Sequence, residues 1–347
     1  MSKTVSQYDF AYSVALVRVL ETMLLSENEV ERMMLAPNAK EAFRVLNEFD
    51  YADNKAGIDN PAKFQKVLDE GLMDIKERLV EVTPEQRVLR ILWYWYDFHN
   101  IKTMVKGKLS EKPYEEIAHL LTPLGFIPLE SLKSVIYLDT DAPFPVTDKS
   151  EKYIKNKIKK VYVLFEKEKR NPLVIDLYFD QKMMKMIHNI AVDSGNEFLI
   201  KYVKKLIDLA NIKLFFRMKI QEKDLDLYEL AFLWNGTIPF SKFKEAFMQN
   251  LSDFPDVLRS TPYARIIAEG YKHYESEKTL IFLEKQVEDH LTRYIKEAKL
   301  SPFGAHPLVA YFLAKKNNAQ IMRMILIHKL NNIDPEEIRT RLRNLYQ

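Results

Sequence analysis

The sequence is short of residue types on which several large classes of protein depend. It has no cysteine in 347 residues, which excludes disulfide frameworks, thiolate catalysis and cysteine-ligated zinc or iron–sulfur sites. Glycine is also scarce: the chain has 8, whereas average usage of about 7% would give roughly 24. Because phosphate-binding loops and tight β-turns rely on glycine at positive φ, its scarcity argues against both.

The chain also lacks an excess of one charge and any long hydrophobic run. Its 52 Lys+Arg and 49 Asp+Glu leave a net charge of +3, which is too balanced for a protein that wraps nucleic acid. The longest uncharged stretch, residues 300–314, is broken by prolines and falls short of the ~18–20 residues that span a bilayer. The N-terminal apolar run is interrupted by Arg18 and Glu21, unlike a signal peptide. We therefore expect a globular cytosolic protein.

Apolar residues recur with the period of an α-helix along most of the chain. Two capping boxes, beginning at Ser26 and Asn38, mark helix starts. Strict period-two alternation is almost absent, and prolines and acidic residues around 139–149 predict a loop. We therefore predict an all-α fold. The other amphipathic runs lie at residues 63–80, 86–109, 151–169, 181–192, 197–219, 279–297, 307–330 and 335–346.

The most informative pattern is an internal repeat with an offset of 111 residues. Residues 97–109 read DFHNIKTMVKGKL, and residues 208–220 read DLANIKLFFRMKI. At the same offset, Gly125 and Gly236 each begin a Gly-x-Ile-Pro sequence. A weaker third copy occupies 318–330 (NAQIMRMILIHKL) and is followed by DPEEIRTRL (334–342), which resembles KPYEEIAHL (112–120).

This repeat divides the chain into three helical units. Their predicted bounds are 1–123, 124–234 and 235–347. Repeats of 20–50 residues indicate a solenoid, but units of this length can each hold a core of their own. Three such units favour a pseudo-threefold ring or funnel over a stacked rod.

The repeated helix carries an Asp, an Asn and a Lys on one stripe. One interpretation is a hydrogen-bond cluster that holds helix against helix. The other is that three equivalent stripes line a central opening and contact a partner. The third copy differs most, with Asn318 and Ile321 in place of Asp and Asn. The candidate partner-binding residues are Asp97, Asn100, Lys108, Asp208, Asn211, Lys219, Arg323 and Lys329.

Catalytic and metal-binding motifs are missing from the sequence. The seven histidines have no metal-binding spacing, and there is no HExxH, Walker loop, GxGxxG or GxSxG. Asp139 and Asp141 form an acidic pair without the downstream ligands of a calcium loop. We therefore predict no catalytic residue, no cofactor and no metal.

Residues 149–170 form a basic amphipathic segment. Nine Lys/Arg oppose three acids, and Ile154, Ile158, Val161 and Phe165 make an apolar stripe. The segment can be a solvated helix that covers the core, or it can contact an acidic partner or anionic lipid. Nucleic acid is disfavoured, because the segment lacks the interleaved aromatics expected of a stacking platform. The aromatic cluster at 93–96 surrounds its helix, which fits burial better than base stacking.

The chain resembles the C subunit of the archaeal and bacterial V/A-type rotary ATPases, equivalent to the d subunit of the eukaryotic vacuolar enzyme. The resemblance lies in residues 8–25 (YDFAYSVALVRVLETMLL), 33–51 (MMLAPNAKEAFRVLNEFDY), the repeated NIK helices, and 322–346. It implies a non-catalytic subunit, built as an all-helical funnel of three similar domains.

The resemblance also implies a place in the motor. The protein would sit peripherally on the cytoplasmic face of the membrane rotor ring, in one copy per complex. It would receive the foot of the central stalk (subunits of the D and F type) and transmit torque for proton or sodium transport. The alternative function is a stand-alone helical scaffold that binds acidic proteins or anionic lipid through residues 149–170.

Overall fold

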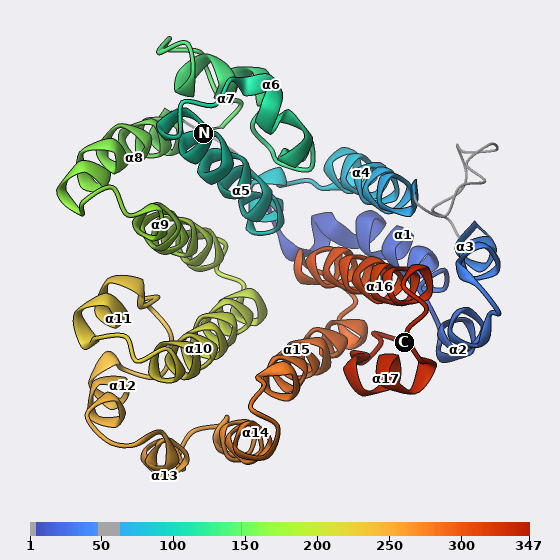
Figure 1. Ribbon diagram of the computed structural model, residues 1–347. Coiled ribbons are helices and arrows are strands. Elements are labelled where there is room, and N and C mark those ends of the chain that lie inside the picture. Colours follow the sequence, from blue (N-terminus) through green and yellow to red (C-terminus); the bar gives the residue numbers. More distant parts are fainter. Residues whose placement is uncertain (1–4, 48–62, 147) are drawn as a thin grey trace. The chain divides into compact units, whose positions relative to one another are not determined.

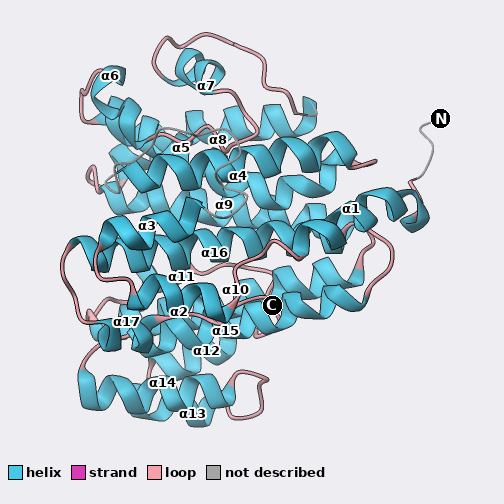
Figure 2. Ribbon diagram, turned by 90° about the vertical axis from the view of Figure 1, so that its right-hand side faces the viewer, coloured by secondary structure: helices cyan, strands magenta, loops and turns pink. Residues whose placement is uncertain are grey.

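A computed structural model describes residues 5–47, 63–146 and 148–347. Within these ranges the chain forms α-helices, short 3-10 turns and loops, and no strand is found (Figure 2). The prediction of an all-α fold is therefore confirmed.

The chain divides into two compact units, each assembled from stretches far apart in the sequence. One unit comprises Met1–Gln86, Asn196–Tyr202 and Leu258–Gln347, and the other comprises Arg87–Gly195 and Val203–Val257. The three repeat units and their bounds stay a prediction, as does the pseudo-threefold funnel.

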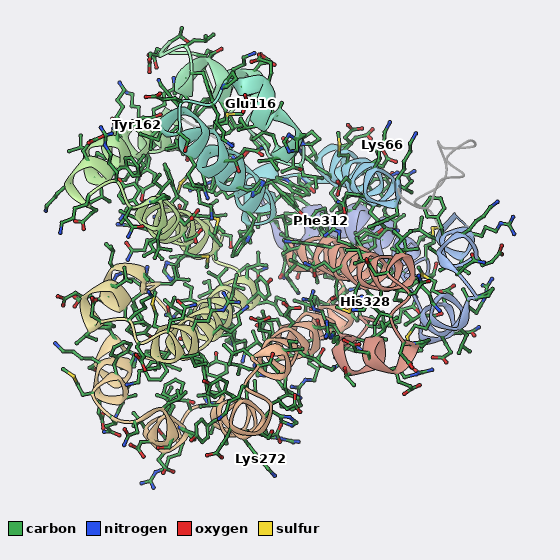
Figure 3. All side chains as sticks on the ribbon, viewed as in Figure 1. Lys66, Glu116, Tyr162, Lys272, Phe312 and His328 are labelled. Atoms are coloured by element: carbon green, nitrogen blue, oxygen red, sulfur yellow. The ribbon has the colours of Figure 1, made fainter. Side chains whose placement is uncertain are left out.

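In the first unit, the long helix α16 is the central element. It packs against α1, α3, α4 and α15 (Figure 1). Because four neighbours surround it, α16 is buried on nearly every side, including Phe312, labelled in Figure 3. The helices of this unit are α1 (Ala11–Glu21), α2 (Glu27–Leu35), α3 (Ala39–Asn47), α4 (Phe64–Val82), α14 (Ala264–Glu277), α15 (Ile281–Lys296), α16 (His306–Leu330) and α17 (Pro335–Arg341).

In the second unit, α9 packs along both α5 and α8 (Figure 1). The helix α10 (Glu197–Ile220) begins in the first unit and continues in this one. An aromatic cluster, with Phe215 stacked on Phe254 at a centroid distance of 3.8 Å, packs around α10. The other helices are α5 (Arg90–Leu109), α6 (Tyr114–Ile117), α7 (Leu129–Ile136), α8 (Asp148–Lys167), α9 (Pro172–Asp193), α11 (Leu225–Ala231), α12 (Phe240–Phe247) and α13 (Phe254–Val257).

Several local predictions can be compared directly with these helices. The capping box at Ser26 is formed, with the Ser26 N–H donating to the Glu29 carboxylate at 2.7 Å. The Asn38 side chain accepts from the Glu41 N–H at 3.0 Å. The apolar stripe of the basic segment is buried along α8, as expected of a helix that covers the core.

One helix is considerably longer than predicted. The periodic pattern indicated 181–192, but α9 begins at Pro172 with Asn171 as its N-cap. Its first turns carry buried residues on several faces, such as Val174, Ile175 and Phe179, because α5 and α8 both pack against it. A helix buried on more than one side has no single apolar stripe, so the periodic signal fails there.

Candidate functional site

The three repeated helices α5, α10 and α16 end in the same backbone geometry. Just past the end of each helix, one residue adopts the left-handed conformation. The backbone N–H of the residue that follows it donates to the carbonyl of the residue five positions before that donor. This is the Schellman ending of a helix. The left-handed residues are Glu111 (φ 55°), Glu222 (φ 52°) and Asn332 (φ 53°). The returning bonds run from Lys112 to Gly107 (3.0 Å), from Lys223 to Met218 (2.9 Å) and from Ile333 to His328 (2.9 Å).

These endings occur at the offsets of the sequence repeat. Glu222 follows Glu111 by 111 positions, and Asn332 follows it by 221. The third copy, which is the weakest in sequence, therefore repeats the backbone geometry of the other two.

In the first copy, two buried side chains of α5 hold the segment that leads into α7. The Asp97 carboxylate accepts from the Ile127 N–H at 2.8 Å. Asn100 exchanges two hydrogen bonds with Thr122: its amide donates to the carbonyl at 2.8 Å and accepts from the N–H at 3.0 Å. Neither Asp97 nor Asn100 has any exposed surface. We call such an arrangement the Asp–Asn clamp.

The second copy repeats the clamp on α10. Asp208 accepts from the backbone N–H groups of Thr237 at 2.8 Å and Ile238 at 3.0 Å, and from the Thr237 hydroxyl. Asn211 exchanges two hydrogen bonds with Leu233, at 2.8 and 2.9 Å. Both clamp residues are again fully buried. The buried hydrogen-bond cluster inferred from sequence is therefore present in both copies.

The two glycines of the repeat belong to the clamps. A Cβ added to Gly125 would lie 2.4 Å from the Oδ1 atom of Asp97, and one added to Gly236 would lie 2.2 Å from that of Asp208. Both distances are far below van der Waals contact, so only glycine lets the backbone approach the carboxylate this closely. This accounts for glycine at these positions in a chain that otherwise has little of it.

In the third copy, the clamped backbone comes from the other end of the sequence. The Asn318 amide lies between the Leu25 N–H and the Ala314 carbonyl. Oriented so that both groups are satisfied, its oxygen accepts from the Leu25 N–H at 2.7 Å and its nitrogen faces the Ala314 carbonyl at 3.3 Å. Ile321, at the position of the clamp Asn, is an apolar core residue. Leu25 directly precedes the capping residue of α2, so α2 occupies the place that α7 and α12 have in the other copies.

The lysines near the ends of α10 and α16 contact the C-terminal end of the short helix that the clamp of their own copy holds. Lys219 donates to the carbonyls of Phe247 (3.0 Å) and Gln249 (2.9 Å) at the end of α12. Lys329 donates to the Ala36 carbonyl at the end of α2 (2.7 Å), and burial lowers the pKa of its ammonium. A cation at a helix C-terminus is favourable because it compensates the exposed carbonyls there.

The remaining candidates form ion pairs. Lys108 pairs with Asp139, just beyond α7, at 2.8 Å, and its ammonium lies 5.8 Å from the ring centroid of Tyr162 (labelled in Figure 3). Burial raises the pKa of the Tyr162 phenol to about 12. Arg323 donates to Gln65 at 2.7 Å and lies 3.6 Å from Asp69, both on α4.

Seven of the eight candidates are therefore distributed over three equivalent arrangements, each holding a short helix against a repeated one, whereas Arg323 contacts α4 instead. Partner binding by these residues stays a prediction. Any contribution that the buried clamp residues make to it must pass through the backbone segments that they hold. The sequence offset pointed to the clamp residues and their glycines, but the role of Leu25 could not be found, because it lies outside the offset pattern.

Metal-ligating clusters and membrane-spanning helices are not found in the part of the chain that the structure describes. No three His, Asp or Glu side chains in the described ranges come together as a metal centre would require. None of the described helices is both long enough and apolar enough to cross a membrane.

The fold and the clamps define a helical repeat protein in which buried polar groups position backbone segments. Comparison with known proteins identifies the family. The model of the ATP synthase (C/AC39) subunit family matches residues 13–341. The chain therefore belongs to this family.

Curated relatives agree with the family assignment. The C subunit of the A-type ATP synthase of Methanocaldococcus jannaschii is 26% identical, and the match covers 97% of this chain and 86% of the relative. The C subunit of the V-type sodium ATPase of Enterococcus hirae is 24% identical over 95% of this chain and 97% of the relative. The C subunit of the A-type ATP synthase of Methanococcoides burtonii is 26% identical, and the match covers 97% of this chain and 95% of the relative. The chain is thus a subunit of the A/V-type ATPase class, and in this class the C subunit is non-catalytic.

Proposed function

We propose that this chain is the rotor subunit that joins the central stalk to the membrane ring of an A/V-type ATPase. In this role it transmits torque during ion transport, and no bond is made or broken in it. The partners are central-stalk subunits and ring subunits, and the chain lies peripherally at the cytoplasmic face in one copy per complex.

One observation carries the proposal: the family match spans all three copies of the repeated helix, since 97–109, 208–220 and 318–330 all lie within residues 13–341. A coupling element must not yield under load, and the clamps support such a role. Each short helix is fixed at its start by a clamp and at its end by a lysine. Buried hydrogen bonds of this kind help to make such joints rigid.

Affinity purification of the intact complex tests the proposal. A tagged copy of the chain, expressed in place of the untagged one, should co-purify with stalk and ring subunits in a fixed ratio. Membranes that lack the chain should hydrolyse ATP without driving ion transport, since head and ring are no longer joined. A complex that assembles and remains coupled without the chain would contradict the proposal.

The candidate residues allow a finer test of where the stalk binds. If the ends of the repeated helices face the stalk, Lys108→Glu should weaken binding to purified stalk subunits more than it lowers the melting temperature. A variant of an exposed lysine in the first turns of α10, at the opposite end of that helix from Lys219, serves as a control of equal charge change: Lys201→Glu. Equal stalk affinity for both variants would place the stalk elsewhere on the chain.

A further inference from the structure

Two neighbouring helices of the second unit carry the same spacing of tyrosine and lysine. Both α8 and α9 read Tyr-x3-Lys-x2-Lys, and the two helices are joined by residues 168–171 and pack against each other (Figure 1). The six residues, here called the paired lysine patch, are Tyr153, Lys157, Lys160, Tyr178, Lys182 and Lys185.

The two halves of the patch have matching geometry. The Lys157 ammonium lies 4.8 Å from the ring centroid of Tyr153, and the Lys182 ammonium lies 4.9 Å from that of Tyr178. Each half-buried lysine is thus held over a tyrosine of its own helix, while Lys160 and Lys185 are exposed. Cation–π contacts of this kind favour these positions of the ammonium groups.

The patch has an uncompensated positive charge. In the part of the chain that the structure describes, none of its four lysines forms an ion pair. Burial and the neighbouring patch lysines lower the pKa of both Lys157 and Lys182.

The two acids on the first turns of α9 do not relieve this charge. Asp176 pairs with Lys106 at 3.0 Å, and Asp180 pairs with Lys102 at 2.7 Å, both on α5. These two carboxylates therefore form ion pairs between α9 and α5, and not with the lysines of the patch. Like charges held together in this way favour binding of an anionic group that neutralises them.

We propose that the paired lysine patch binds an acidic helical segment of a partner protein. Its lysines stand three residues apart on each of two helices, a spacing that carboxylates at i and i+3 or i+4 on a third helix can match. Fixed spacing of this kind suits a protein segment, whereas a lipid surface responds to the number of exposed lysines regardless of their arrangement. The inference concerns a different part of the chain from the clamps and does not depend on the proposed function.

The test uses the full chain and a fluorescent, alanine-based helical peptide with glutamates at i, i+3, i+4 and i+7. We expect Lys157→Glu/Lys182→Glu to weaken peptide binding about tenfold at low salt. The matched control is Lys152→Glu/Lys159→Glu, which changes the same charge at two exposed lysines of α8 outside the patch, and we expect it to change affinity less than twofold.

Two other results would overturn the proposal. An equal loss of affinity in both double variants would show that the peptide responds to net charge alone. Preferential binding of vesicles with 20% phosphatidylserine over the peptide, with the same sensitivity to the patch variant, would assign the surface to lipid.

A second variant, Lys157→Gln/Lys182→Gln, separates loss of binding from misfolding. Removing like charges should leave the melting temperature unchanged or higher, and this variant should still bind the peptide less tightly.

Discussion

At the scale of single residues, the clamp carboxylates show why an Asp occurs in a buried position without catalytic chemistry. Asp208 accepts three hydrogen bonds from one short segment, which compensates for burying its charge. The third copy clamps one backbone N–H, and there the neutral amide of Asn318 suffices.

A double-mutant cycle tests the fit between Asp208 and Gly236. Asp208→Ala should lower the free energy of unfolding by about 1–3 kcal/mol, because buried N–H groups lose their acceptor. Gly236→Ala should also destabilise by about 1–3 kcal/mol, since its methyl group collides with the carboxylate. In the double variant the methyl group has room, so the combined loss should be smaller than the sum. Additive losses in urea unfolding would mean that the two residues do not interact.

His306 gives a prediction for pH. It stacks on Phe198 at a centroid distance of 4.9 Å and contacts the Asn196 amide at 3.1 Å. Burial, and secondarily the positive charge of Arg18, lowers the His306 pKa to about 4.

The unfolded chain therefore binds a proton at His306 near pH 6.5, and the folded chain does so only near pH 4. The contribution of the neutral imidazole to stability is complete above about pH 6.5 and is lost as the pH falls toward 4. Urea midpoints for the wild-type chain and for His306→Gln, measured at pH 7, 6, 5 and 4, should converge as the pH falls. A constant difference between the two proteins would contradict the lowered pKa.

At the scale of elements, the helix endings show how much of the fold the sequence predicts. Periodicity identified the long helices, and the offset identified α5, α10 and α16 as copies. The left-handed positions were not predicted, because Glu111, Glu222 and Asn332 include no glycine to mark them. Their conformation is imposed by the returning hydrogen bond and the packing that follows it.

Glycine at one of these positions should therefore stabilise the chain. A non-glycine residue in the left-handed conformation carries a steric cost, so Glu222→Gly should raise the free energy of unfolding by about 0.5–1 kcal/mol. Glu229→Gly, within the helix α11, is the control and should be destabilising by a similar amount. Calorimetric melting of both variants checks the sign, and destabilisation by Glu222→Gly would be inconsistent with a Schellman ending.

The lysines at the helix ends should differ in their importance for stability. Lys219→Glu places a carboxylate against the two carbonyls at the end of α12 and should cost about 1–2 kcal/mol. Lys108→Glu breaks a pair with the largely exposed Asp139 and should cost less than about 1 kcal/mol. Urea unfolding of the two variants side by side measures the difference. Equal costs would show that the carbonyl contacts of Lys219 contribute nothing.

At the scale of the whole molecule, the missing nucleotide motifs lead to a direct test. Isothermal titration of the purified chain with ATP and Mg²⁺ should give no saturable heat at micromolar concentrations, and the chain should release no phosphate. The catalytic head of an A/V-type ATPase serves as the positive control. A stoichiometric nucleotide site on this chain would contradict a purely mechanical role.

The contact between Leu25 and Asn318 determines when the protein can finish folding on the ribosome. The first two clamps join residues only 30 positions apart and can close soon after their segments emerge. The third joins residues 293 positions apart, and closing a loop about ten times longer costs about 2 kcal/mol more chain entropy. Until α16 is synthesised, apolar side chains of the helices that pack on it, such as Met33 and Met34 of α2, lack one of the helices that bury them in the folded chain. These residues are made well before α16 but are among the last to become native, and nascent chains should need chaperone protection there.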